Sequence, residues 1–229
     1  MSKLAFIIAA GGASRRFGGE PKLLRQLDGI PLFCHCLLTF ADAAPDAPMV
    51  LAAPQELLQR FSQAAQASLP AQLQRRLRIV PGGSSRSESI WHALQHLQAS
   101  PDGLPELIAI HDAARPYCTA ETLAKCLDAL AQEAALQGVV ASHPCTDTIH
   151  TVTAEGIITG TPERATLWCA ETPQIFRSNA LLDAYLHGDW RTTQPTDDAQ
   201  LMQLAGHTRI AVIHSTAPNG KITYITDLQ

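Results

Sequence analysis

Short apolar runs alternate with amphipathic stretches along most of the chain. Apolar runs at residues 4–9, 49–53, 77–80, 107–111 and 138–142 are predicted β-strands. Amphipathic stretches at residues 31–43, 55–64, 87–98 and 120–135 are predicted helices; in the third, Ile90, Leu94 and Leu97 share one helical face. This alternation predicts an α/β fold of the Rossmann-like kind, a mostly parallel, twisted sheet with helices on both faces. Ligands are then expected at the carboxyl ends of the strands.

The strand–helix rhythm stops after Ser142. Residues 145–172 are rich in Thr and contain two segments of alternating β-type sequence, 148–152 and 156–159, with Gly156 and Gly160 supplying turns. This pattern predicts a protruding β-hairpin arm on a single domain of residues 1–229. Helices are predicted at 178–186 and from Asp198 onward, and a last strand at 209–214. Because an isolated hairpin is marginally stable in water, the arm is expected to pack on a second copy in a homodimer.

Composition and charge narrow the class of partner. The 229 residues are 46% hydrophobic, enough for a core, and the formal net charge of -4 argues against generic binding to nucleic acid or an anionic membrane. Anionic substrates would have to be held by local cations. The six cysteines form no CxxC pair, which favours reduced thiols in the cytoplasm over a zinc site or a disulfide framework. The apolar run near the N-terminus is too short to span a membrane and is predicted to be a buried strand.

The exit of the first strand carries the strongest chemical signal. Residues 9–22 read AAGGASRRFGGEPK, in which small residues permit close backbone approach and consecutive N–H groups can cradle phosphate oxygens. Arg15 and Lys22 are spaced to flank a triphosphate. The glycine spacing is not GxGxxG, and no Ser or Thr follows the lysine as in a Walker A loop. Taken alone, this segment is interpreted equally well as a glycine turn with two solvated cations.

Two further strand ends carry polar groups. Residues 82–89 read GGSSRSES and open a helix, so their small side chains and hydroxyls can recognise a base or ribose; an ordinary N-capped helix start is the alternative. Residues 111–116 read HDAARP. Asp112 stands at the carboxyl end of a strand beside the phosphate loop, which makes it a candidate Mg²⁺ ligand, with turn capping as the alternative.

Taken in order, these segments resemble the 2-C-methyl-D-erythritol 4-phosphate cytidylyltransferase family. The resemblance extends along nearly the whole chain. It rests on AAG…R…PK, GG…R…S, HDAARP, Asp147-Thr148, Glu163-Arg164 with Leu167-Trp168, TPQIF at 172–176, TDDA at 196–199 and NGKIT at 219–223. One such motif is weak support, whereas all of them in order are specific. The chain departs from the family at Leu23, where Gln is common, and at Gly220, where Ile is usual.

The resemblance implies transfer of the cytidylyl group of CTP to a sugar-alcohol phosphate, with Mg²⁺ as cofactor. The implied catalytic cations are Arg15, Lys22 and Lys221, and the implied metal ligand is Asp112. The implied nucleotide contacts are Ala9, Ala10, Gly11, Gly82, Gly83, Ser89 and Ala113. The implied acceptor contacts are Arg115, Thr148, Arg164, Thr172 and Thr196, with Arg164 reaching across a dimer into the active site of the partner subunit.

The chemistry of this reaction agrees with those residue types. Attack of one phosphate on another needs positioned positive charge rather than a protein nucleophile. None of the nine histidines is therefore required, and His111 is expected to be structural. Two alternatives remain: ribitol-5-phosphate cytidylyltransferase, which shares the loop and the arm, and an inactive nucleotide-binding protein, against which the retained charged site residues argue.

Overall fold

A mixed sheet forms the centre of the molecule. The computed structural model describes residues 3–11, 21–215 and 217–228. Within these residues, a seven-stranded sheet has the order β11-β7-β10-β6-β1-β4-β5. Its strands are β1 (Leu4–Ala9), β4 (Met49–Ala53), β5 (Leu77–Pro81), β6 (Leu107–Asp112), β7 (Gly138–Pro144), β10 (Trp168–Arg177) and β11 (Ile210–His214). β1 is parallel to β4 and β6, β4 to β5, and β7 to β11, whereas β10 is antiparallel to β6 and β7.

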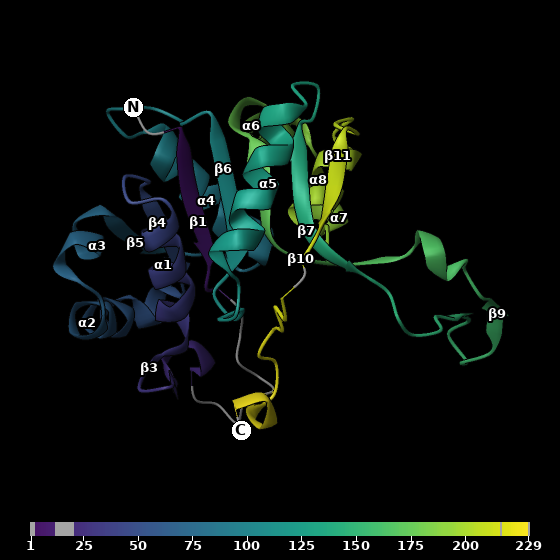
Figure 1. Ribbon diagram of the computed structural model, residues 1–229, viewed down its shortest axis with the longest axis horizontal. Helices are drawn as coiled ribbons and strands as arrows, with labels where there is room; N and C mark the ends of the chain where they lie inside the picture. The colour runs from purple at the N-terminus through teal and green to yellow at the C-terminus, as the bar shows by residue number, and fades with distance from the viewer. Residues whose placement is uncertain (1–2, 12–20, 216, 229) are drawn as a thin grey trace.

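Helices cover both faces of this sheet (Figure 1). α1 (Leu32–Ala43), α2 (Leu58–Ser68) and α5 (Ala120–Gln132) contribute to one hydrophobic core, and α4 (Arg86–Gln98), α6 (Ser178–His187) and α8 (Asp198–Leu204) to the other. The smaller elements are α3 (Ala71–Arg76), α7 (Trp190–Thr193), the 3-10 turns η2 (Lys22–Leu24), η3 (Gln55–Leu57), η4 (Arg164–Thr166) and η5 (Ile225–Leu228), and the ladder of β2 (Gln26–Leu27) with β3 (Ile30–Pro31). Among the described helices, none has both the length and the apolar character needed to cross a membrane.

The continuous apolar sequence of β1 follows from its central place. Alternate side chains point to opposite faces of a strand. Phe6 and Ile8 accordingly pack into the core beneath α1, while Ala5 and Ile7 pack into the core beneath α4. Phe6 also stacks on Phe40 of α1, with ring centroids 4.7 Å apart. Both faces of the strand are therefore buried, and the alternation of polar residues seen in half-exposed strands is absent from it.

The predicted α/β architecture is confirmed, and one central strand was not predicted. The strands predicted at 4–9 and 49–53 match β1 and β4, and the helix predicted at 55–64 forms η3 followed by α2. The strand missing from the prediction is β10, which contains Pro173. Proline cannot donate to a ladder and argues against a central strand. The β10–β7 register shifts between Ala170 and Gln174, so this irregularity accommodates Pro173.

A long arm leaves the body between β7 and β10 (Figure 1). β10 takes up residues 168–172 of the predicted arm, so the part that projects is 145–167. Inside it, β8 (Thr151–Val152) pairs with β9 (Ile158–Gly160) in an antiparallel ladder. Apolar side chains on the arm are exposed, from 42% at Ile149 to 65% at Ile157. The two-stranded ladder of β8 and β9 buries little apolar surface by itself, which favours packing of the arm on another surface.

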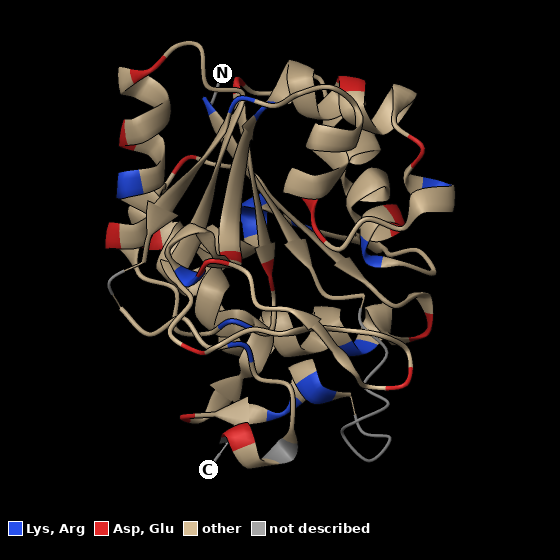
Figure 2. Cartoon of the chain, turned by 90° about the vertical axis from the view of Figure 1, so that its right-hand side faces the viewer, with Lys and Arg blue, Asp and Glu red and all other residues tan. Residues whose placement is uncertain are grey.

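Basic and acidic residues are intermixed on the face shown in Figure 2. This mixed distribution agrees with the small net charge of the whole chain, -4. Strong local fields must therefore come from particular clusters of side chains.

Candidate active site

The carboxyl ends of β1 and β6 bring the first set of predicted residues together. Ala9 is in register with Asp112, and the Ala113 N–H donates to the Ala9 carbonyl at 3.1 Å. On the other side, the Ala10 N–H donates to the Ala52 carbonyl of β4 at 2.9 Å. Ala9 and Ala10 are thus fixed by backbone bonds immediately before the glycine loop. Arg15, predicted as a catalytic cation, lies outside the described residues.

Ser89 of α4 contacts both glycine segments, Gly11 after β1 and Gly82-Gly83 after β5. Its Oγ accepts from the Gly83 N–H at 3.0 Å and donates to the Ser85 carbonyl at 2.9 Å. A Cβ added at Gly11 would lie 2.5 Å from this oxygen, and one added at Gly82 would lie 2.9 Å from it. Both positions therefore need glycine because the backbone passes so close to Ser89. Gly11 and residues 82–89, far apart in sequence, are therefore in close contact.

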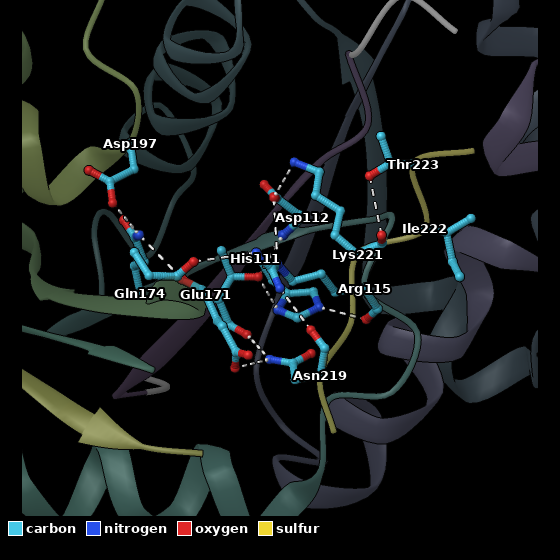
Figure 3. Close-up of polar contacts among 12 residues, drawn as sticks. His111, Asp112, Arg115, Glu171, Gln174, Asp197, Asn219, Lys221, Ile222 and Thr223 are labelled. Carbon is cyan, nitrogen blue, oxygen red and sulfur yellow. Dashed lines mark hydrogen bonds and ion pairs between the residues drawn. The ribbon is translucent and has the colours of Figure 1, made fainter. Parts of the chain in front are cut away.

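Asp112 is the charged centre of the site (Figure 3). Its Oδ1 accepts from Arg86 Nε at 3.1 Å and its Oδ2 from Lys221 Nζ at 2.7 Å, while Arg115 Nε lies 3.9 Å from Oδ2. Burial raises the pKa of Asp112, but the charges of Arg86 and Lys221 outweigh it and hold the pKa well below its usual range. The side chain, 11% exposed, is therefore an ionised carboxylate facing several cations.

This donor set fits magnesium bound together with a nucleotide. Among the described residues, no group of three or more His, Cys, Asp and Glu side chains could hold a metal ion by itself. Mg²⁺ usually needs one or two carboxylates, completed by substrate phosphates and water. A single ionised carboxylate at the end of β6 meets the protein's part of that requirement. Asp112 is the residue that would hold the metal.

The C-terminal segment runs across the carboxyl ends of the strands and carries two contacts to the site (Figure 1). Lys22 Nζ donates to the Ile222 carbonyl at 2.6 Å, and the Ile222 N–H donates to the Ala114 carbonyl at 2.9 Å. Burial, followed by the positive charge of Lys221, lowers the pKa of Lys22. The segment thus places Lys22 and Lys221 close enough to repel each other.

Asn219 anchors this segment beside the root of the arm. Its buried Nδ2 donates to Glu171 Oε2 at 3.1 Å and to the Thr172 carbonyl at 2.7 Å. Its main-chain carbonyl accepts from Arg115 Nη1 at 2.7 Å. Through its side chain and its main chain, Asn219 therefore connects β10, the HDAARP turn and the segment that bears Lys221 (Figure 3).

Thr172 and His111 form a buried pair beneath Asp112. Thr172 Oγ1 accepts from the Asp112 N–H at 3.2 Å and lies 2.9 Å from His111 Nδ1. His111 Nε2 lies 3.0 Å from the Arg115 carbonyl, and burial lowers the pKa of His111 to about 4. His111 is thus neutral near pH 7 with both ring nitrogens engaged, in keeping with a structural role.

Three predicted acceptor residues lie apart from this cluster. Thr148 and Arg164 are on the projecting arm, where Arg164 Nη1 donates to the Thr146 carbonyl at 3.1 Å. Thr196 precedes α8 and directs both its N–H and its hydroxyl to Gln200 Oε1, at 2.7 and 3.1 Å. Within one chain, the arm therefore carries its polar residues away from the sheet edge (Figure 1).

Sequence reasoning missed Arg86 and Asp198. Arg86 Nη1 donates to Asp198 Oδ2 at 2.6 Å, across 112 positions of sequence. A local signal was present at Arg86, because it is the first residue of α4 and a cation is disfavoured at a helix N-terminus. Such a placement implies an acidic partner, although only the fold shows which one.

Comparison with known proteins agrees with this geometry. The family model of 2-C-methyl-D-erythritol 4-phosphate cytidylyltransferase matches residues 4–229. The enzyme of that name from Carboxydothermus hydrogenoformans is 32% identical over 237 residues, covering 100% of this chain and 94% of the relative. The one from Symbiobacterium thermophilum is 33% identical over 227 residues, covering 99% and 90%. The crystal structure of the Thermus thermophilus enzyme superposes with a TM-score of 0.73 at 26% identity, covering 99% of this chain and 96% of that one. This chain therefore belongs to the 2-C-methyl-D-erythritol 4-phosphate cytidylyltransferase family.

Proposed function

We propose that this chain transfers the cytidylyl group of CTP to 2-C-methyl-D-erythritol 4-phosphate. The products would be 4-diphosphocytidyl-2-C-methyl-D-erythritol and pyrophosphate, in non-mevalonate isoprenoid biosynthesis. The working form would be a cytoplasmic homodimer that needs Mg²⁺. The observation that carries the proposal is the carboxylate of Asp112, held between Arg86 and Lys221 at the end of β6. Family membership along residues 4–229 supports CTP and 2-C-methyl-D-erythritol 4-phosphate as the substrates.

The arrangement suits a reaction between two anions. The acceptor phosphate supplies its own oxygen nucleophile, so catalysis requires alignment and positive charge. Lys22 and Lys221 provide two ammonium groups, one bonded to the Ile222 carbonyl and one to Asp112, and Arg15 would add a third cation from the loop. Mg²⁺, when bound, would neutralise developing charge on the phosphates. His111 is buried with both nitrogens engaged, which supports a mechanism without a histidine base.

The residues around Ser89 would hold the nucleotide. The backbone of Gly82 and Gly83 passes close to Ser89, so a larger side chain at Gly82 would strike it. Ala9, Ala10, Gly11 and Ala113 would border the phosphates. Arg115 and Thr172 remain proposed acceptor contacts, although Thr172 is buried and its hydroxyl lies between the Asp112 N–H and His111 Nδ1. Thr196 lies two residues before Asp198, the partner of Arg86. Thr148 and Arg164 would join the acceptor site from the partner subunit.

Removal of divalent metal is expected to abolish turnover. Asp112 is already ionised, and its charge is balanced by side-chain cations that Mg²⁺ would have to replace in part. Excess chelator should therefore reduce pyrophosphate release by at least about 10²-fold, and added Mg²⁺ should restore it. Asp112→Asn, of nearly the same shape, is the matched variant and should stay inactive at any Mg²⁺ concentration. Full turnover in excess chelator would contradict the metal assignment.

Substrate selectivity tests the proposed function directly. Glycine backbone lies close to Ser89, and we expect this region to suit a pyrimidine, whose Watson–Crick edge differs from that of a purine. CTP is expected to be used well ahead of ATP and GTP, and 2-C-methyl-D-erythritol 4-phosphate ahead of ribitol 5-phosphate. The measurement is pyrophosphate release with each nucleotide–acceptor pair. Preference for ribitol 5-phosphate would support the alternative cytidylyltransferase, and no release from any pair would support an inactive nucleotide-binding protein.

A further inference from the structure

Arg86 occupies a bridging position between two carboxylates. Its Nε donates to Asp112 Oδ1 at 3.1 Å, and its Nη1 donates to Asp198 Oδ2 at 2.6 Å. The guanidinium thus connects the end of β6 to the first turn of α8. Because Ser89 follows on the same helix, α4 links the proposed nucleotide contact at Ser89 to both acids.

The ion pair with Asp198 fixes the position of the Arg86 guanidinium. The Asp198 side chain is 1% exposed, and its second oxygen accepts from the Tyr185 hydroxyl at 2.7 Å. A buried carboxylate needs a paired cation, and removal of one partner is strongly destabilising. Burial alone would lower the pKa of Arg86, but Asp198 and then Asp112 raise it above its usual value. Arg86 is therefore a fixed cation held from two sides.

The two oxygens of Asp112 consequently have different partners. Oδ1 is bound by Arg86, whose far side is anchored in the protein interior. Oδ2 accepts from Lys221 Nζ at 2.7 Å, and the Lys221 side chain is 45% exposed, while Arg115 Nε lies farther from this oxygen, at 3.9 Å. Arginine forms a rigid planar fork, whereas lysine is a flexible point charge. The Lys221 contact is thus the one that can exchange.

We propose that Arg86 is a positioning residue for metal-nucleotide binding. It holds Asp112 Oδ1 in place, so that Asp112 would be oriented to hold Mg²⁺ together with CTP. Lys221, now paired with Oδ2, would then be available to the triphosphate. Through Asp198, the same guanidinium aligns the start of α8, two residues after Thr196. This inference rests on the proposed function and adds to it a residue outside the predicted site.

A ratio of binding constants separates positioning from simple stabilisation. The dissociation constant of CTP is measured by calorimetry with and without Mg²⁺, and the metal-dependent gain in affinity is compared among variants. Arg86→Lys keeps the positive charge but cannot bridge both acids with fixed geometry. The gain is expected to fall at least about tenfold in this variant, the range found for groups that orient metal ligands. An unchanged gain would overturn the proposal, because a structural defect would weaken CTP binding equally in both conditions.

A double variant provides the second, independent readout. Arg86→Met leaves Asp198 buried without its cation and is expected to lower the melting temperature. Adding Asp198→Asn removes the uncompensated charge, so Arg86→Met/Asp198→Asn should recover stability but not the metal-dependent gain in CTP affinity. Recovery of both would mean that Arg86 acts only by neutralising Asp198. Wild-type protein that fails to bind Mg²⁺-CTP at all would instead refute the proposed function, so the two failures are distinguishable.

Discussion

Lys22→Ala is expected to lower kcat by about 10²–10³-fold while the protein stays folded. The Lys22 ammonium, at the start of η2, lies 2.6 Å from the Ile222 carbonyl. Burial and the nearby charge of Lys221 both lower the pKa of Lys22. The two ammonium groups therefore repel each other in the absence of substrate. A polyanion bound between them would relieve this repulsion, and the benefit would be greatest in the charge-rich transition state. The measurements are kcat by pyrophosphate release and the melting temperature.

The stability of this variant should change little. The hydrogen bond to Ile222 is one polar contact, of the kind that contributes about 1 kcal/mol to folding. Lys125→Ala is a matched control, because Lys125 lies on the exposed surface of α5 and pairs with Glu121 at 2.7 Å. Loss of that pair should cost about 0.5 kcal/mol or less and leave kcat unchanged. Wild-type turnover in Lys22→Ala, or loss of turnover only through unfolding, would show that Lys22 has no catalytic role.

Mixing Lys22→Ala and Arg164→Ala subunits is expected to restore activity that neither homodimer has. Arg164 belongs to the arm, whose apolar side chains at Val152 and Ile158 are 55% and 58% exposed. If the arm reaches a partner, each heterodimer has one site with both residues and one with neither. Random exchange makes half of the dimers heterodimers with half of their sites intact, so the mixture should reach about a quarter of wild-type activity.

A second mixture controls for nonspecific recovery. Lys22 and Asp112 both lie on the body of one chain, so mixing Lys22→Ala with Asp112→Asn leaves every site with one lesion. That mixture should stay inactive. Heterodimer formation is verified by native mass spectrometry of differently tagged chains. Verified Lys22→Ala/Arg164→Ala heterodimers without activity would place Arg164 in its own subunit's site or outside the mechanism.

The strands on either side of the site could be predicted because their signals are local. β1 and β4 are buried on both faces, so each appears in sequence as one unbroken apolar run bounded by residues that break it. Asp112 stood out for the same reason, since a polar residue at the end of an apolar run marks the edge of a sheet. The glycine positions were also readable, although the reason for two of them, the approach of Ser89, is tertiary.

β10 escaped prediction because its own sequence argues against a strand. Pro173 cannot donate to a ladder, and the buried Gln174 looks like a surface residue until its partners are known. Gln174 Nε2 donates to Asp197 Oδ2 at 2.9 Å, a contact between distant segments. The irregular β10–β7 pairing that accommodates the proline depends on β7 and β6 already lying on either side.

The α/β class and the acid at the strand end could be predicted from sequence, because each depends on neighbouring residues. Phosphate binding by the glycine-rich segment after β1 stays a prediction. Tertiary structure decided how these parts are charged and held. Arg86 meets Asp198 across 112 positions, and Lys221 meets Asp112 across 109. Such pairs leave no periodic trace in a single sequence, since either partner alone resembles an ordinary surface charge. Only when the chain folds does burial remove water from them, and their charges then become strong enough to order the site.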